Sequence, residues 1–252
     1  KAETASPEVM ADCPRRIILP VNDGRLIAIN AENGKLCETF ANKGVLNLQS
    51  NMPDTKPGLY EPTSPPIITD KTIVMAGSVT DNFSTRETSG VIRGFDVNTG
   101  ELLWAFDPGA KDPNAIPSDE HTFTFNSPNS WAPAAYDAKL DLVYLPMGVT
   151  TPDIWGGNRT PEQERYASSI LALNATTGKL AWSYQTVHHD LWIWIFRHSR
   201  RWRTSPLMVR KCQLFTLRRK PATFLCSIVV MANWWFRHRK NRFPKVQRKA
   251  IT

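Results

Sequence analysis

The segment Gly90-Val-Ile-Arg-Gly-Phe-Asp96-Val-Asn-Thr-Gly100-Glu-Leu-Leu-Trp104 contains the pattern that decides the fold. Its apolar residues predict a short strand that runs into Asp96, whose side chain can cap a turn. Four residues later Gly100 supplies the positive φ that reverses the chain, and Trp104 follows on the returning strand. The segment therefore predicts a tight β-hairpin with a large aromatic ring on its second strand.

The same hairpin pattern occurs three times along the chain. Its turns end at Gly34, Gly100 and Gly178. Trp182 repeats the offset of Trp104 from the turn glycine, whereas the first repeat has Glu38 there. The turn glycines are 66 and 78 residues apart, so each unit is longer than a minimal four-stranded blade and includes long loops. Equivalent hairpins at such a period indicate an all-β protein, either a propeller or a sandwich array.

The composition changes abruptly after Trp192. Residues 191–252 contain 16 of the 31 Lys and Arg residues but none of the 23 acidic residues and none of the 13 glycines. The formal net charge of +8 therefore combines a body at −8 with a tail at +16. A stretch without glycine lacks the residue that most β-turns and helix C-caps use. We therefore divide the chain into a propeller body, residues 1–192, and an aberrant basic tail, residues 193–252, which we expect to be disordered and not a native domain.

The four cysteines show no metal-ligand spacing. A disulfide between Cys13 and Cys37 is one option, which the sequence leaves open. The longest apolar run is too short to span a bilayer, and the first residues lack the pattern of a signal peptide. The chain as given is thus expected to carry no targeting or transmembrane segment.

The repeated Trp offset resembles the tryptophan-docking motif of the pyrroloquinoline quinone (PQQ) dehydrogenases, which are eight-bladed β-propellers. The segments between the repeats are similar to those of the membrane-bound quinoprotein glucose dehydrogenases of that family. These segments are residues 60–67, 125–137 and 148–158. The resemblance runs from about Asp12 to Trp192 and implies a partial propeller of about three blades.

The resemblance also implies an activity and a location. Members oxidise the C1 hydroxyl of glucose, or of a related aldose, to the lactone and pass the electrons through PQQ to ubiquinone. They lie at the periplasmic face of the bacterial inner membrane and reach the membrane through N-terminal helices, for which this chain shows no counterpart. No specific nucleic-acid partner is expected.

The residues that would face PQQ follow from the same resemblance. PQQ is a flat tricarboxylic quinone, so its site needs an aromatic platform, polar groups for the carboxylates and a divalent cation that polarises a carbonyl. Trp131 stands at the position of the stacking ring, and Thr63 and Ser78 stand at the positions of the hydroxyls that face carboxylates. His121 matches the residue that covers the other PQQ face, and Glu87 matches the carboxylate that ligates Mg²⁺ or Ca²⁺. Without the resemblance, these residues would be interpreted as a core aromatic, turn caps and a solvated charge.

Other polar residues are interpreted more cautiously. At Thr151 the related alcohol dehydrogenases have an Asn ligand, and a hydroxyl binds a hard cation less readily than an amide oxygen. His188 and His189 are interpreted as structural, because adjacent strand residues point to opposite faces. The Asp that acts as general base is expected beyond Trp192, so no catalytic residue is assigned in the body.

The tail is interpreted as a frameshifted fourth repeat. Family members continue after Trp192 with Asp-Met-Asp-Leu-Pro-Ala. Codons for that sequence, GAT ATG GAT CTT CCG GCA, give Ile-Trp-Ile-Phe-Arg when read one base later, which is residues 193–197. The same displacement of a second family-like segment reproduces Ala222–Phe236 without a mismatch. The basic residues of the tail therefore need no functional explanation.

Two alternatives remain at this stage. The tail could make the protein a basic module that binds nucleic acid or a membrane surface, and an ordered tail would favour that hypothesis. The body could also be a propeller scaffold that works without PQQ, and such a scaffold would lack the Thr63, Ser78 and Glu87 constellation.

The 252-residue chain is expected to be inactive alone, because the general base is expected beyond Trp192. With PQQ, Mg²⁺ or Ca²⁺, and glucose, it should reduce a dye no faster than the background without enzyme. Restoring the frame after the Trp192 codon, with the rest of the gene, should give glucose oxidation that depends on PQQ and the cation. Turnover by the 252-residue chain would contradict the first expectation, and a repaired enzyme that oxidises only short alcohols would contradict the glucose assignment.

Overall fold

The computed structural model describes residues 5–118 and 120–192, which belong to one compact unit. Thirteen strands and two short helices make up its regular structure, so the expected all-β fold is confirmed. The basic tail, residues 193–252, lies outside the described residues. Its disorder and the boundary at residue 192 therefore stay predictions.

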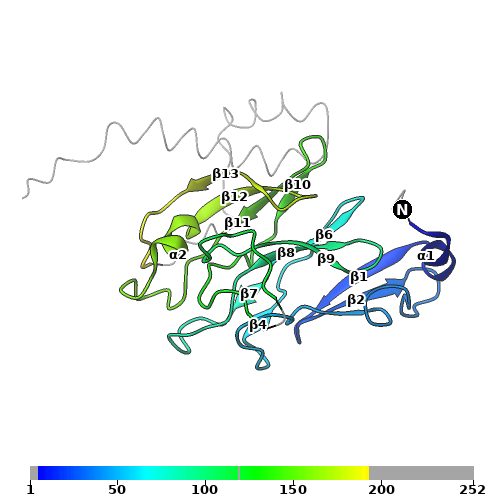
Figure 1. The fold of residues 1–252 in the computed structure, drawn as a ribbon, viewed down its shortest axis with the longest axis horizontal. Helices are drawn as coiled ribbons and strands as arrows, with labels where there is room; N and C mark the ends of the chain where they lie inside the picture. Colours follow the sequence, from blue (N-terminus) through cyan, green and yellow to red (C-terminus); the bar gives the residue numbers. More distant parts are fainter. Residues whose placement is uncertain (1–4, 119, 193–252) are drawn as a thin grey trace, which may run out of the picture. The chain divides into compact units, whose positions relative to one another are not determined.

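Two four-stranded antiparallel sheets contain eight of the thirteen strands (Figure 1). We call them blade 2 and blade 3, and the sheet that precedes them blade 1. The strands of blade 2 are, in order, β5 (Ile67–Ile68), β6 (Thr72–Met75), β8 (Ile92–Asp96) and β9 (Leu102–Phe106). Those of blade 3 are β10 (Ala135–Asp137), β11 (Leu142–Pro146), β12 (Ser169–Asn174) and β13 (Leu180–Gln185). Each blade is an antiparallel meander, as the hairpin repeats predict.

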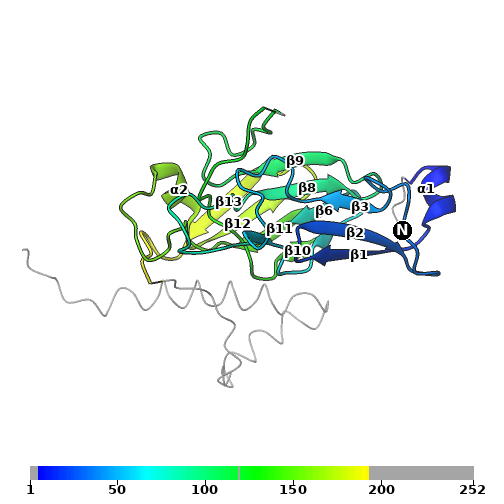
Figure 2. The same ribbon diagram turned by 90° about the horizontal axis from the view of Figure 1, so that it is seen from below.

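Blade 1 contains three strands among the described residues. They are β1 (Arg16–Val21), β2 (Arg25–Asn30) and β3 (Val45–Asn47). The returning chain pairs with β2 twice, first through the bridge from Leu36 to Ile29 and then through β3. Figure 2 shows the three blades following one another between the helices α1 and α2.

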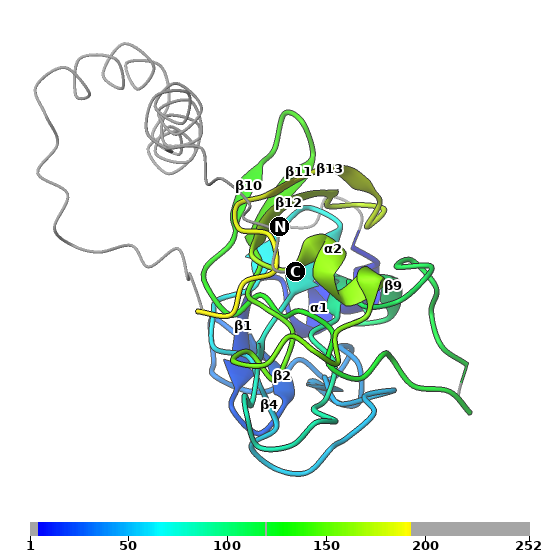
Figure 3. The same cartoon turned by 90° about the vertical axis from the view of Figure 1, so that its left-hand side faces the viewer.

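The remaining elements are small and lie in the connections. Helix α1 (Pro7–Asp12) precedes β1, and β4 (Tyr60–Glu61) pairs with β7 (Ser78–Val79) in a two-stranded sheet. Helix α2 (Pro161–Tyr166) begins with a capping box between Thr160 and Gln163 and packs against β12 and β13 (Figure 3). No helix in the described ranges is long and apolar enough to cross a membrane.

The predicted hairpin turns are present in all three repeats. The turn glycines have positive φ values of 74° at Gly34, 76° at Gly100 and 69° at Gly178. In blade 2 the Asp96 carboxylate accepts a hydrogen bond from the Thr99 amide at 2.8 Å. In blade 3 the Asn174 side chain does the same for Thr177 at 2.8 Å. The acidic or amide residue therefore caps the turn, as the sequence indicates.

Apolar side chains fill the spaces between the blades. One cluster joins blade 1 to blade 2 and includes Leu26, Ala28, Phe40, Ile73, Met75 and Phe95. A second joins blade 2 to blade 3 and includes Val74, Ile92, Trp104, Val143, Leu145 and Leu171. Successive residues of β6 thus point alternately to the two clusters, as a strand with neighbours on both faces requires.

Trp104 docks on the next blade. The ring is 4% exposed, and its Nε1 donates to the Ala175 carbonyl oxygen at 3.1 Å, in the turn that ends at Gly178. A Cβ added at Gly178 or at Gly94 would overlap the ring. The ring therefore fits only because glycine occupies both positions.

The resemblance to the tryptophan-docking motif implies that Trp104 and Trp182 both pack against an adjacent blade, and Trp182 does not. It occupies the same place in its hairpin, opposite Ala172 as Trp104 is opposite Gly94. It is nevertheless 43% exposed and lies beside Tyr144 of its own blade, with 5.8 Å between ring centroids. The reason is that no further blade stands beside β13 within the described residues.

In the first repeat, Phe40 and Arg16 pack on the turn of the next blade in place of a tryptophan. A Cβ added at Gly100 would lie 3.1 Å from Phe40 Cζ, so Phe40 covers the turn of blade 2. Arg16 adds hydrogen bonds from Nη1 to the carbonyl oxygens of Val97 at 2.9 Å and Asn98 at 2.8 Å. Phe40, two residues after Glu38, thus has the docking role that tryptophan has in the second repeat.

Cys13 and Cys37 form a disulfide with 5.5 Å between their Cα atoms. Both residues are buried. The pairing that the sequence leaves open is therefore present, and it links the segment after α1 to the hairpin of blade 1.

Trp104→Ala is expected to lower the free energy of unfolding by about 3–5 kcal/mol, because it removes a buried ring and leaves a cavity between two blades. Trp182→Ala, the matched control, is expected to cost about 1 kcal/mol, because much of that ring is already in water. Urea unfolding of the two variants measures the difference. Equal losses would contradict the asymmetry of the two rings.

Candidate cofactor and cation site

The chain segments of blades 2 and 3 meet at Trp131. Thr63, two residues after β4, donates from Oγ1 to the Trp131 carbonyl oxygen at 2.9 Å. Ser64 donates to the same oxygen at 2.6 Å. Two hydroxyls from the connection ahead of blade 2 therefore hold the backbone of a residue just before blade 3, and the structure brings Thr63 and Trp131 together.

Ser78 lies on the same small sheet that positions Thr63. It is the first residue of β7 and pairs with Glu61 of β4. The sheet thus places Ser78 beside the strand that leads into Thr63. The Trp131 side chain is half-buried.

Glu87 is a buried carboxylate, 1% exposed. Its Oε1 accepts a hydrogen bond from the Ser84 amide, and its own amide donates to Asn126 Oδ1 at 2.6 Å. Asn126 Oδ1 also accepts from the Thr151 hydroxyl at 3.4 Å. Glu87 is the predicted cation ligand, and Thr151 stands where the related alcohol dehydrogenases have an Asn ligand. Both therefore share one neighbour, Asn126.

Two further carboxylates, Asp81 and Asp153, belong to this region. Asp81 is open to solvent, but partial burial of its carboxylate and the charges of Asp153 and Glu87 raise its pKa to about 6. Asp153 is 1% exposed, and its Oδ1 accepts from Asn82 Nδ2 at 2.5 Å. Three acidic residues thus stand close enough to disfavour the ionisation of one of them.

The oxygen donors of this region are of the kind that a hard cation accepts. In residues 5–118 and 120–192, no group of three or more His, Cys, Asp and Glu side chains forms a preformed metal cluster. A bound divalent cation would relieve the repulsion among the carboxylates, and a hard cation accepts carboxylate, amide and hydroxyl oxygens together. The sequence did not single out Asp81, although its place three residues after Ser78 was a usable signal.

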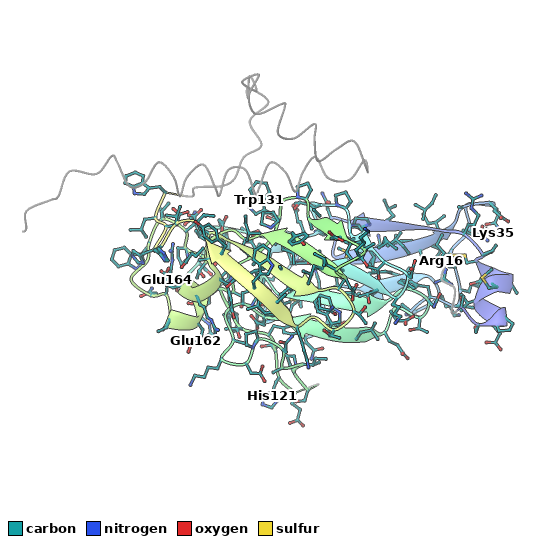
Figure 4. The ribbon with its side chains drawn as sticks, turned by 90° about the horizontal axis from the view of Figure 1, so that it is seen from above. Arg16, Lys35, His121, Trp131, Glu162 and Glu164 are labelled. Carbon is teal, nitrogen blue, oxygen red and sulfur yellow. A yellow bond between two sulfur atoms is a disulfide. The ribbon has the colours of Figure 1, made fainter. Side chains whose placement is uncertain are left out.

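The structure does not bring His121 to the other predicted residues. Figure 4 shows His121 and Trp131 on opposite sides of the described unit. His121 is exposed, and its Nδ1 lies 2.8 Å from Ser118 Oγ. The loop is held toward blade 1, because the His121 carbonyl oxygen accepts from Asn51 Nδ2 at 3.2 Å. Its predicted role against the second PQQ face has no geometric support here.

The His188–Asp190 segment has structural partners. His189 Nδ1 lies 2.8 Å from Glu164 Oε1, and the Asp190 carboxylate accepts from the Ser168 hydroxyl at 2.7 Å. The His189 and Asp190 side chains thus contact different neighbours.

Comparison with known proteins defines the class. Residues 1–194 match the family described as PQQ: Glucose/ethanol/alcohol dehydrogenase, beta-propeller domain. The chain therefore belongs to the PQQ-dependent dehydrogenase propeller family, and the expected family and fold are confirmed.

Its relatives include quinoprotein glucose dehydrogenases. The chain is 65% identical over 180 residues to quinoprotein glucose dehydrogenase A of Acinetobacter calcoaceticus, covering 71% of this chain and 22% of the relative. It is 58% identical over 183 residues to the quinoprotein glucose dehydrogenase of Gluconobacter oxydans (strain 621H), covering 72% and 23%. The chain thus spans less than a quarter of the length of these relatives.

Solved structures agree on the fold. The quinohemoprotein alcohol dehydrogenase of Comamonas testosteroni superposes with a TM-score of 0.55 at 22% identity, over 71% of this chain and 27% of that one. Quinohemoprotein alcohol dehydrogenase ADHIIG of Pseudomonas putida HK5 gives a TM-score of 0.53 at 26% identity, over 71% and 26%.

The raised pKa of Asp81 predicts a pH dependence of stability. Its pKa is higher in the folded chain than the usual value near 4, so the folded state binds the proton more tightly, and the free energy of unfolding falls as pH rises from about 4 to about 6. Asp81→Asn should reduce this fall, whereas the exposed control Asp70→Asn should keep it. Urea midpoints at pH 4, 5, 6 and 7 measure the effect, and an unchanged profile in Asp81→Asn would contradict the assignment.

Proposed function

We propose that this chain is the cofactor-facing part of a quinoprotein that oxidises the C1 hydroxyl of glucose, or of a related aldose, to the lactone. The observation that carries the proposal is the 65% and 58% identity to two quinoprotein glucose dehydrogenases. In this proposal the electrons pass to ubiquinone, and the complete protein works at the periplasmic face of the bacterial inner membrane.

PQQ when bound supplies the ortho-quinone that accepts two electrons from the sugar. The residues of this chain orient it. Trp131 offers a half-buried indole as the platform for the flat ring system, and its backbone is held by the Thr63 and Ser64 hydroxyls. Thr63 and Ser78 carry hydroxyls that can donate to the carboxylates of PQQ. His121 is left out of this site, because of its position on the opposite side (Figure 4).

We assign the cation, Mg²⁺ or Ca²⁺, to the region of Asp81, Glu87 and Asp153, which we call the carboxylate region. Oε1 of Glu87 already accepts the Ser84 amide, and Asp153 accepts from Asn82. Asp81 is the carboxylate that stays open to solvent, so it is the one that a cation reaches first. Glu87 and Asp153 then supply buried negative charge around it, which raises the affinity for a divalent ion.

The alternative functions are separated by ligand binding. A propeller scaffold without PQQ would bind neither PQQ nor the cation at these residues. The nucleic-acid or membrane-surface hypothesis rests on residues 193–252, which lie outside the described part, and no contact in residues 5–118 and 120–192 favours it.

Titration of the 252-residue chain with PQQ, with and without Mg²⁺ or Ca²⁺, tests the proposal by equilibrium dialysis and by quenching of tryptophan fluorescence. Trp131→Ala should weaken PQQ binding by about tenfold, which is about 1.4 kcal/mol, because the stacking surface is lost. Trp182→Ala, an exposed ring on the outer strand of blade 3, should bind PQQ as the wild type does. Equal affinity of Trp131→Ala and wild type, or binding that ignores the cation, would contradict the proposed site.

A further inference from the structure

Arg159 has a buried side chain in the loop that carries Thr151 and Asp153. The side chain is 1% exposed. Nη2 donates to the Asp153 carbonyl oxygen at 2.8 Å, and Nη1 donates to the Asp190 carbonyl oxygen at 2.8 Å. The guanidinium therefore joins two segments that are 37 residues apart in the chain.

Ion pairing alone does not explain this burial. The nearest carboxylate oxygen is Glu164 Oε1, 3.4 Å from Nη1, and the same oxygen lies 2.8 Å from His189 Nδ1. Nε of Arg159 has no partner among the described residues. Burial of a charge is unfavourable unless hydrogen bonds compensate it, and most hydrogen bonds of this guanidinium go to backbone carbonyl oxygens, those of Pro152 at 3.5 Å, Asp153 and Asp190. The side chain therefore holds two backbone segments together. A planar fork with several fixed donors can bridge two carbonyl oxygens, whereas the single ammonium of lysine cannot reproduce that geometry.

The bridge continues to the carboxylate region. The carbonyl oxygen of Asp153 is held by Arg159, and the carboxylate of the same residue is held by Asn82 at 2.5 Å. Asn82 follows Asp81 directly. The backbone of Asp153 is thus joined through Arg159 to the Asp190 segment, and its side chain is joined to Asn82, the neighbour of Asp81 in the chain.

We propose that Arg159 is a positioning residue that clamps the Pro152–Asp153 backbone against the Asp190 segment and so keeps Asp153 beside Asn82 and Asp81. Arg159 contacts the backbone of Asp153 and no side chain proposed to meet the cofactor or the cation, so it acts through Asp153. The consequence for cation binding rests on the proposed function, whereas the clamp itself does not.

The test compares Arg159→Gln, which removes the charge, with Arg159→Lys, which keeps the charge but not the fork. Arg165→Gln is the matched control, because Arg165 lies over the Tyr166 ring, 5.0 Å from its centroid, and in the part of the chain that the structure describes no hydrogen bond or ion pair joins it to the loop. Hydrogen–deuterium exchange of the metal-free 252-residue chains follows the backbone of residues 153–158. Mn²⁺ titration at pH 7 then follows the affinity of the carboxylate region.

Both Arg159 variants should exchange about tenfold faster in residues 153–158, while β11 and β12 stay as protected as in the wild type. Both should also bind Mn²⁺ about tenfold more weakly than the wild type and Arg165→Gln. Wild-type exchange of the loop in Arg159→Lys would overturn the clamp, and so would faster exchange spread evenly over β11 and β12, which marks a general structural role. If Arg159→Gln does not fold, Arg159→Lys decides alone.

The outcome separates the two proposals. A wild-type chain that binds no Mn²⁺ overturns the proposed cation site, and the exchange of residues 153–158 still decides whether Arg159 is the clamp. Wild-type binding of Mn²⁺ with no loss in either Arg159 variant overturns the positioning role and leaves the cation site standing.

Discussion

The contact of the Trp104 ring with the turn of the next blade is the interaction on which the described arrangement depends. The indole is buried between Gly94 and Gly178, and its only donor is satisfied by the Ala175 carbonyl oxygen. Burial of a large ring supplies free energy, and the single hydrogen bond sets its orientation. Asn114 adds to the same junction, since Nδ2 donates to the carbonyl oxygens of Ala105 at 3.0 Å and Gly178 at 3.1 Å. Blade 2 is thereby held against blade 3.

The candidate site is a consequence of that junction. Thr63 and Ser64 reach the Trp131 carbonyl oxygen only because the connections of the two blades lie side by side. Asn82 and Asp153 are 71 residues apart in the chain, yet their side chains are hydrogen bonded. A site assembled from loops of neighbouring blades can hold groups that no single hairpin could bring together. This is the usual advantage of placing functional residues on loops above a rigid scaffold.

Different side chains cover the turn glycine at the two blade junctions. Between blades 2 and 3 an indole covers the turn glycine, and between blades 1 and 2 a phenyl ring from Phe40 covers it while Arg16 supplies the hydrogen bonds. The disulfide from Cys13 to Cys37 adds a covalent link beside the smaller ring. Docking of one blade on the next therefore requires an aromatic surface over a glycine turn, and does not require tryptophan.

The sequence by itself determined the hairpins, because their turns depend on local chemistry: an Asp or Asn that caps the turn, and a glycine four residues later that tolerates positive φ. It also determined the family, through the dense likeness of the segments around Thr63, Trp131 and Thr151. Only the tertiary structure decided that Trp104 is buried while Trp182 is exposed, because burial depends on whether another blade stands beside the ring. The tertiary structure also placed His121 away from Trp131. It brought Asp81 close to Asp153 and Glu87. Such distances between loops depend on how blades pack, and residue spacing along one chain does not encode them.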